Sequence, residues 1–270
     1  MMKNIGPGCF EEGSIELLPA FFVLAEAQIC LNPPRLKKAE NFLVSAFWNL
    51  LKSTSDESEK RADDDLVSEK DIERFKAGLH KTFGRFFLAQ NTPEAFKSAC
   101  EHLTKGIYLE CMEFGPESYR MCSAYYYMGD LFRKHGENPN PKAKAFFTKI
   151  VQIWKAFILD SDFDPMQEYT YSCIEPIYYE EAEQHLRNML IFFEMDLGQN
   201  HPATAECQFT YGLVGLKIGN VGQAHEAIKA AHDIYANNLG EFDEKTKEVG
   251  EILQNLEERL QPHMDQYQDQ

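Results

Sequence analysis

Short motifs that mark the common enzyme classes are missing from this chain. It contains no G-x-G-x-x-G or G-x-x-x-x-G-K-[ST] loop for a nucleotide, no H-E-x-x-H for a catalytic zinc ion and no G-x-S-x-G for a nucleophilic serine. No two cysteines are spaced as Cys-x-x-Cys, the arrangement that supplies paired thiolates to structural zinc. We therefore expect no catalytic residue, no metal site and no cofactor, and a protein that is not an enzyme.

Basic residues are scarce. The 270 residues include 27 lysines and arginines against 43 aspartates and glutamates, which gives a net charge of −16. Most faces of such a chain would repel phosphate backbones and anionic membranes, so neither nucleic acid nor a membrane is an expected partner. The acids concentrate between residues 54 and 73, where large apolar side chains are nearly absent. This stretch is predicted to be a solvated acidic insert.

Long hydrophobic runs are also absent. The longest, residues 15–31, is interrupted by Glu16, Pro19 and Glu26, and two carboxylates are unfavourable in a membrane-spanning helix. Residues 1–13 contain no basic region followed by an apolar run, so we expect an N-terminal arm and no secretory signal. The seven cysteines are odd in number and widely spaced, which is typical of reduced thiols in an intracellular protein.

A recurring unit favours a helical repeat protein. Four times a large apolar residue precedes a small one inside a predicted helix: Leu24-Ala25, Phe83-Gly84, Met128-Gly129 and Tyr211-Gly212. A polar turn follows, and then an alanine and a bulky residue four positions later: Ala39 and Leu43, Ala99 and Leu103, Ala143 and Phe147, and Ala224 and Ile228. The small residue lets a second helix lie close to the first, and the bulky residue fills the gap.

Glycine and proline predict where these helices end. Phe114-Gly115, Leu197-Gly198 and Leu239-Gly240 are each expected to end a second helix, at intervals that indicate a unit of about 42 residues. Proline-rich turns are predicted at residues 32–35, 91–97 and 136–142. Pro176 is expected to kink or end the first helix of a divergent unit over residues 165–198.

These markers predict an all-α fold, a tetratricopeptide-like α-solenoid of antiparallel helix pairs. About five repeats would occupy residues 14–260, interrupted by the acidic insert and followed by a polar tail at residues 261–270. The period near 42 and the sequence LGQNHPATA at residues 197–205 resemble the longer repeats of kinesin light chains. A helical bundle without repeats is the alternative, because small residues also recur on amphipathic helices by chance.

In stacked helix pairs the first helices line a concave surface, and side chains two, five and nine positions into each helix point inward. At these positions the sequence predicts a mixed groove of aromatic anchors and both signs of charge, suited to a helix or an extended peptide. Solvated surface is the alternative for each residue. The candidate partner-binding residues are Phe22, Glu26, Lys81, Arg85, Tyr126, Asp130, Arg133, Phe209 and Leu213.

Two other groups of residues offer further interpretations. His225 and His232 lie about two helical turns apart, but a pair of histidines without a third ligand is more typical of a protein surface than of a metal site. Tyr125, Tyr126 and Tyr127 resemble an aromatic box, although at least two of them must face helix packing. Core packing is therefore the preferred interpretation of the tyrosines.

Several segments resemble the repeat region of the zinc finger MYND domain-containing protein 12 family. They are SIELLPAFFVLAEA (14–27), AENFLVSAFWNLLKST (39–54), IYLECMEFGPESYR (107–120), YYYMGDLFRK (125–134) and FFTKIVQIWKAFI (146–158). The resemblance covers residues 14–160 and fades towards the C-terminus. It implies a protein of motile cilia and flagella, associated with an inner-arm axonemal dynein and with another tetratricopeptide protein. Animal members begin with a zinc finger of Cys-x-x-Cys pairs, which this chain lacks, so zinc binding is not carried over.

The expected function is therefore that of a non-catalytic scaffold. The resemblance implies a place in the ciliary axoneme, within a large complex, where the scaffold would dock or stabilise a single-headed inner-arm dynein through protein–protein contacts. A cytosolic adaptor for cargo or for dynein assembly, similar to a kinesin light chain, is the alternative. An enzyme or metalloprotein that uses His225, His232 and the scattered cysteines is a third.

Overall fold

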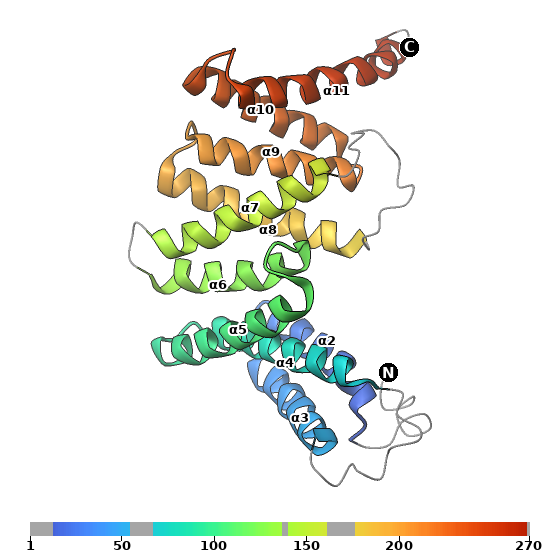
Figure 1. The fold of residues 1–270 in the computed structure, drawn as a ribbon, viewed down its shortest axis with the longest axis vertical. Coiled ribbons are helices and arrows are strands. Elements are labelled where there is room, and N and C mark those ends of the chain that lie inside the picture. The colour runs from blue at the N-terminus through green and yellow to red at the C-terminus, as the bar shows by residue number, and fades with distance from the viewer. Residues whose placement is uncertain (1–12, 55–66, 137–139, 161–175, 269–270) are drawn as a thin grey trace. The chain divides into compact units, whose positions relative to one another are not determined.

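A computed structural model describes residues 13–54, 67–136, 140–160 and 176–268, and for residues 259–268 it describes the backbone alone. Regular secondary structure in these ranges consists of helices, and no strand occurs in them (Figure 1). Neighbouring helices pack against each other, which is consistent with an α-solenoid. The predicted all-α fold class is confirmed.

The chain divides into two compact units, residues 1–117 with 127–143 and residues 118–126 with 144–270. The 3₁₀ turns η1 (Ile15–Leu17) and η3 (Tyr119–Met121) precede α2 and α6. The helices are α2 (Leu18–Ile29), α3 (Leu36–Thr54), α4 (Glu69–Gln90), α5 (Pro93–Phe114), α6 (Cys122–His135), α7 (Pro141–Asp160), α8 (Pro176–Leu197), α9 (Pro202–Lys217), α10 (Val221–Leu239) and α11 (Glu244–Gln268).

Small residues bring paired helices together in both units. In the first unit, a Cβ atom added to Gly84 of α4 would lie 2.5 Å from Leu103 Cδ2 of α5. In the second unit, a Cβ atom on Gly212 of α9 would lie 2.6 Å from Ile228 Cγ1 of α10. Both bulky residues are fully buried, as are the alanines of the repeating pattern. The predicted contact between small and bulky residues is therefore confirmed in these two helix pairs.

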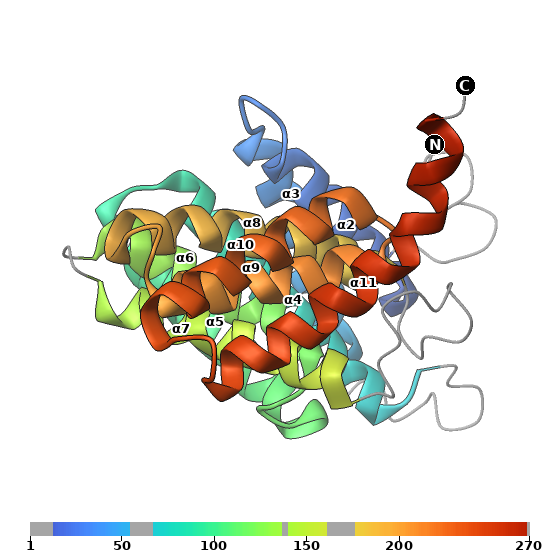
Figure 2. The same cartoon turned by 90° about the horizontal axis from the view of Figure 1, so that it is seen from above.

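The second unit continues as a series of adjacent helices. α8, α9, α10 and α11 follow one another, each packed against the next, in Figure 1, and they overlap when seen from above in Figure 2. Phe147 of α7 meets Phe193 of α8 with ring centroids 6.5 Å apart. The Nζ atom of Lys155 on α7 lies 3.9 Å from Glu206 Oε1 on α9 and 3.1 Å from Glu248 Oε2 on α11. Aromatic packing and shared charges thus connect the helices of this unit.

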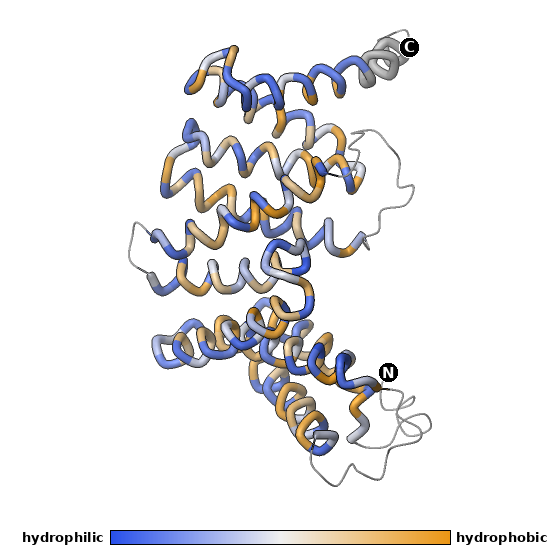
Figure 3. Tube along the Cα trace, in the orientation of Figure 1, coloured by the Kyte–Doolittle hydropathy of each residue, from blue (hydrophilic) through white to orange (hydrophobic). Residues whose placement is uncertain are grey.

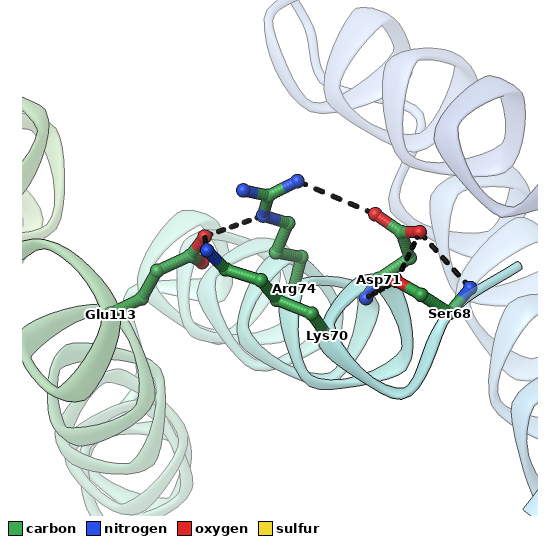
Figure 4. A network of polar contacts seen from close by, with 5 residues as sticks. All are labelled: Ser68, Lys70, Asp71, Arg74 and Glu113. Atoms are coloured by element: carbon green, nitrogen blue, oxygen red, sulfur yellow. Dashed lines mark hydrogen bonds and ion pairs between the residues drawn. The ribbon is translucent and has the colours of Figure 1, made fainter.

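A capping box begins α4 within the predicted acidic insert. The Ser68 hydroxyl accepts from the backbone N–H of Asp71 at 3.2 Å, and the Asp71 carboxylate accepts from the backbone N–H of Ser68 at 3.1 Å. Hydrogen bonds from Ser68 and the nearby Arg74 guanidinium hold the pKa of Asp71 below its usual value. Arg74 also pairs with Glu113 of α5 at 2.5 Å (Figure 4). The predicted insert is therefore wrong from Glu69 onward, and residues 55–66 lie outside the described residues.

Prolines begin helices in this structure. Pro93, Pro141 and Pro176 are the first residues of α5, α7 and α8, where the missing N–H is not needed. The turns predicted at residues 91–97 and 136–142 are therefore too long. Pro176, expected to kink or end a helix, is the first residue of α8. Residues 161–175, which hold most of the first helix expected in the divergent unit, lie outside the described residues. The turn expected at residues 32–35 does separate α2 from α3.

The predicted glycine ends are confirmed. Gly115, Gly198 and Gly240 follow α5, α8 and α10 with φ angles of +79°, +95° and +91°. A Cβ atom at any of them would meet nothing within 4 Å, so the positive φ, and not lack of space, accounts for glycine there. Helix α11 continues to Gln268, through most of the predicted polar tail at residues 261–270. Residues 1–12 of the predicted arm lie outside the described residues.

Replacing Gly212 with alanine should destabilise the protein. The new methyl group would lie 2.6 Å from Ile228 and 3.1 Å from the carbonyl oxygen of Ala224, so α9 and α10 must separate. We expect the free energy of unfolding to fall by about 1–3 kcal/mol in urea denaturation. Gly222→Ala on α10 is the matched control, because its Cβ atom would meet nothing within 4 Å. Equal effects of the two substitutions would contradict the close approach at Gly212.

Candidate functional site

Three of the predicted groove residues form ion pairs within the first unit. Glu26 of α2 pairs with Arg85 of α4 at 2.6 Å, and the Arg85 guanidinium lies 4.5 Å from the centre of the Tyr127 ring. Lys81 of α4 pairs with Glu110 of α5 at 3.1 Å. These side chains connect helices of the chain itself, so a change at any of them would alter the stability of the first unit.

Removing the charge of Lys81 should destabilise the first unit. Lys81→Met keeps the aliphatic stem but leaves the buried Glu110 carboxylate without its cation, and Glu110 Oε2 already has no hydrogen-bond partner among the described residues. We expect the free energy of unfolding, measured by urea denaturation, to fall by about 1–3 kcal/mol. The Lys81→Met/Glu110→Gln variant should recover part of this loss. Lys97→Met, in an exposed pair with Glu101, should change stability by less than about 0.5 kcal/mol. If Lys81→Met proved as neutral as this control, the ion pair would be unimportant.

Two predicted contact residues of α6 are buried. Tyr126 stacks on His185 with ring centroids 3.7 Å apart, and its hydroxyl accepts a hydrogen bond from Asn188 at 3.0 Å. Asp130 accepts a hydrogen bond from the predicted groove residue Arg133 at 2.8 Å. The prediction that Tyr126 is an open aromatic anchor is wrong, because the second unit uses its ring as core. The core interpretation of the tyrosines is confirmed for Tyr125 and Tyr126.

The predicted anchors of α9 are fully buried. Phe209 and Leu213 have no exposed surface, because α9 lies between α8 and α10. Their assignment to a partner-binding groove is therefore wrong. Sequence position alone could not separate an inward-facing groove residue from a core residue on a helix covered on both sides. Phe22 of α2 is half-buried and lies against Gly78 of α4, where an added Cβ atom would meet its ring at 3.1 Å.

An apolar face of α3 is uncovered instead. Val44, Phe47, Trp48 and Leu51 are 42–54% exposed and recur at helical spacing along one side of the helix. The adjacent side of α3 is buried through residues that include Ala39, Leu43, Ala46 and Leu50. Figure 3 shows how hydrophobic α3 is along its length. Helix α3 therefore has a wide apolar surface, and only part of it is buried in the fold of the first unit.

A groove of about 250 Å³ adjoins this face. Its walls come from α3, α4 and α5 of the first unit, and rings and aliphatic side chains predominate. The lining residues are Phe47, Leu50, Leu51, Thr54, Lys76, Leu79, His80, Phe83 and His102. Pockets that enclose a cofactor or small-molecule substrate usually measure roughly 300–1,000 Å³. The groove is thus smaller than such pockets.

Two histidines at the groove bind each other. His80 Nδ1 of α4 and His102 Nδ1 of α5 are 3.0 Å apart, so one ring donates and the other, unprotonated at that nitrogen, accepts. Burial, His102 and the Lys105 ammonium lower the pKa of His80 to about 4. Burial and Lys105 also lower the pKa of His102, against an opposing effect of Glu101. Both imidazoles are therefore neutral near pH 7, and the groove keeps an uncharged wall.

Acidification should weaken the first unit through this pair. Because the pKa of His80 is lower in the folded chain than the ordinary 6.5, the unfolded chain binds more protons between pH 6.5 and about 4. This contribution to the free energy of unfolding is fully present above pH 7 and is lost as the pH falls through this window; with solvent screening of the half-buried ring, the loss is on the order of 1 kcal/mol at pH 5. His80→Gln/His102→Gln should flatten this pH dependence in thermal denaturation. His225→Gln is the control, and equal slopes in all three proteins would refute the assignment.

The apolar face lies on locally basic helices. Helix α3 carries Lys37, Lys38 and Lys52 against a single acid, Glu40. Helix α4 carries five basic residues against three acidic ones, and one of its lysines, Lys76, lines the groove. Both helices therefore have a positive net charge in a chain whose total is −16. The surroundings of the groove differ in charge from the chain as a whole.

The structure gives little support to a reactive thiol or a metal site. Burial raises the pKa of Cys122 and Cys207, which keeps both thiols protonated and unreactive. His225 lies 3.0 Å from Glu257, and His232 lies 3.7 Å from Asp233. In the ranges that the structure covers, no group of three or more histidine, cysteine, aspartate or glutamate side chains could hold a metal ion.

No described helix is both long and apolar enough to cross a membrane.

No family model matches the chain.

Sequence reasoning missed both the uncovered face of α3 and the imidazole pair. A signal for the face was present, because the run AFWNLL from Ala46 to Leu51 places apolar residues on more than one side of the helix. Nothing in the sequence joins His80 to His102, since only the packing of α4 on α5 brings these rings together.

Proposed function

We propose that this chain is a non-catalytic protein-binding scaffold built from tetratricopeptide-like helix pairs. The observation that carries the proposal is the apolar face of α3, whose four large side chains are 42–54% exposed beside an apolar groove. A contiguous apolar surface rimmed by charged residues is typical of a site where another protein docks. The close contacts Gly84–Leu103 and Gly212–Ile228 support the repeat character of the helix pairs.

The chemistry of the groove favours binding over catalysis. Its polar side chains are Thr54, Lys76, His80 and His102. Thr54 donates to the backbone of its own helix, Lys76 pairs with Glu73, and the two imidazoles bind each other. A nucleophile oriented by a base is not formed by these lining residues, whereas the surrounding rings offer contact area to a partner.

We place this scaffold in the axoneme of motile cilia or flagella, where it would help to dock or stabilise a single-headed inner-arm dynein together with another tetratricopeptide protein. Support comes from the resemblance to the zinc finger MYND domain-containing protein 12 family. One resembling segment, residues 39–54, contains the entire uncovered face of α3. A cytosolic adaptor for cargo or dynein assembly is the competing proposal, based on the kinesin-light-chain-like period.

Extraction of cilia separates these two settings. We expect the tagged wild-type chain to remain with axonemes after detergent and moderate salt, because it is held by protein contacts. Phe47→Ser/Trp48→Ser should release most of it, whereas Tyr108→Ser/Met112→Ser, at exposed positions of α5, should not. Immunoblotting of the pellet and supernatant measures the retained fraction. A wild-type chain found only in the detergent-soluble fraction would favour the cytosolic adaptor, and full retention of the Phe47/Trp48 variant would show that α3 is not the docking face.

A further inference from the structure

We propose that the uncovered face of α3 and its adjoining groove bind an amphipathic helix of a partner protein, with an apolar stripe flanked by carboxylates. This inference rests on the proposed scaffold function and adds the chemistry of the partner. It is derived from the shape of the face and from the charge around it.

The shape favours a helix. Val44, Phe47, Trp48 and Leu51 occupy positions i, i+3, i+4 and i+7, a stripe about 11 Å long. A second helix that lies along such a stripe can insert its own apolar side chains between those of α3. The groove beside Phe47 and Leu51 reaches Leu79 and Phe83 of α4, which gives one or two of these side chains a place to enter.

The charge favours an acidic partner. Exposed Lys37 and Lys38 lie at the start of α3, and Lys52 lies in its last turn. Lys76 lines the groove, where it pairs with Glu73 at 2.6 Å. Lysines therefore lie at both ends of the apolar surface, whereas the lysine on the groove wall is already paired with a carboxylate. Carboxylates on the flanks of a docked helix would meet them, while a lysine-flanked helix would be repelled.

A second copy of this chain fits the face poorly. An antiparallel α3–α3 contact would bring Lys37 and Lys38 of each copy close to Lys52 of the other, and a parallel contact would bring each lysine close to its own equivalent. The net charge of −16 adds repulsion between whole chains. The acidic residues 55–66 of the same chain have the right sign, but their largest apolar side chain before Leu66 is Ala62. They could not fill a groove lined by Phe47 and Phe83.

A membrane surface is a different class of occupant. Tryptophan and lysine on one amphipathic helix also suit an anionic lipid interface. However, the groove is a concave site with two wall imidazoles that are neutral and already bound to each other. Such a recess is filled by protruding side chains of a folded partner, and a flat lipid surface would leave it empty. Anionic vesicles therefore serve as a contrasting probe.

Three labelled peptides test the inference on the full chain. Each is an 18-residue helix former with one leucine stripe, flanked by glutamate, glutamine or lysine. In fluorescence anisotropy at 50 mM salt, the glutamate peptide should bind about tenfold more tightly than the lysine peptide, with the glutamine peptide between them. The difference should shrink at 300 mM salt. Emission of Trp48 should shift to the blue, while Trp154, only 2% exposed, should contribute a constant background.

Matched variants locate the binding. Phe47→Ser/Trp48→Ser should weaken the glutamate peptide at least about tenfold, and Tyr108→Ser/Met112→Ser should leave it unchanged. Circular dichroism establishes that both variants fold. A triple variant, Lys37→Gln/Lys38→Gln/Lys52→Gln, should bind the glutamate peptide with less preference over the lysine peptide. Its affinity for the glutamine peptide should stay the same. If the lysines acted only on the structure, the affinity for all three peptides would fall.

The remaining outcomes overturn the inference in distinguishable ways. Equal or tighter binding of the lysine peptide would refute the acidic partner and leave an apolar docking face intact. If no peptide binds while Phe47→Ser/Trp48→Ser still releases the chain from axonemes, the occupant is not a helix of this kind and the scaffold proposal stands. Flotation with anionic vesicles that depends on Trp48 would identify a membrane site. A Trp48-dependent dimer in sedimentation would identify a second copy. If no peptide binds and Phe47→Ser/Trp48→Ser does not release the chain from axonemes, both proposals are refuted.

Discussion

The close approach of paired helices at small residues is the constraint on which this structure depends. Gly84 admits Leu103, and Gly212 admits Ile228, at distances that leave no room for a methyl group. Because these contacts are short, other side chains of the paired helices, such as Phe86 and Ala99, are also buried. The residues of the repeating pattern therefore form core, and each helix pair becomes a unit to which the next helix can be added.

Close packing also determines what happens to the charged residues. Glu26 meets Arg85 and Lys81 meets Glu110, because α2, α4 and α5 lie near enough for their side chains to join across the helices. Charges that a loosely packed array would offer to a partner are used here within the first unit. The apolar face of α3 remains exposed, because this helix is covered on one side only.

Apolar and charged side chains occupy different parts of this surface. The His80–His102 pair adds no charge to the groove wall, where Lys76 is paired with Glu73, and further positive charges lie at the ends of α3 on Lys37, Lys38 and Lys52. In the proposed scaffold function, the apolar recess would supply binding energy through burial, and the surrounding lysines would discriminate between partners of opposite charge.

The sequence by itself determined the all-α class, the small-residue contacts and the glycines that end α5, α8 and α10, because each depends on residues close together along the chain. It misjudged Pro93, Pro141 and Pro176, since proline both ends one helix and begins another. Only the tertiary structure decided that Phe209 and Leu213 are core, that Lys81 pairs with Glu110 and that one face of α3 is uncovered. Those outcomes depend on which helix lies on the far side of a given residue, and a periodic pattern does not specify this.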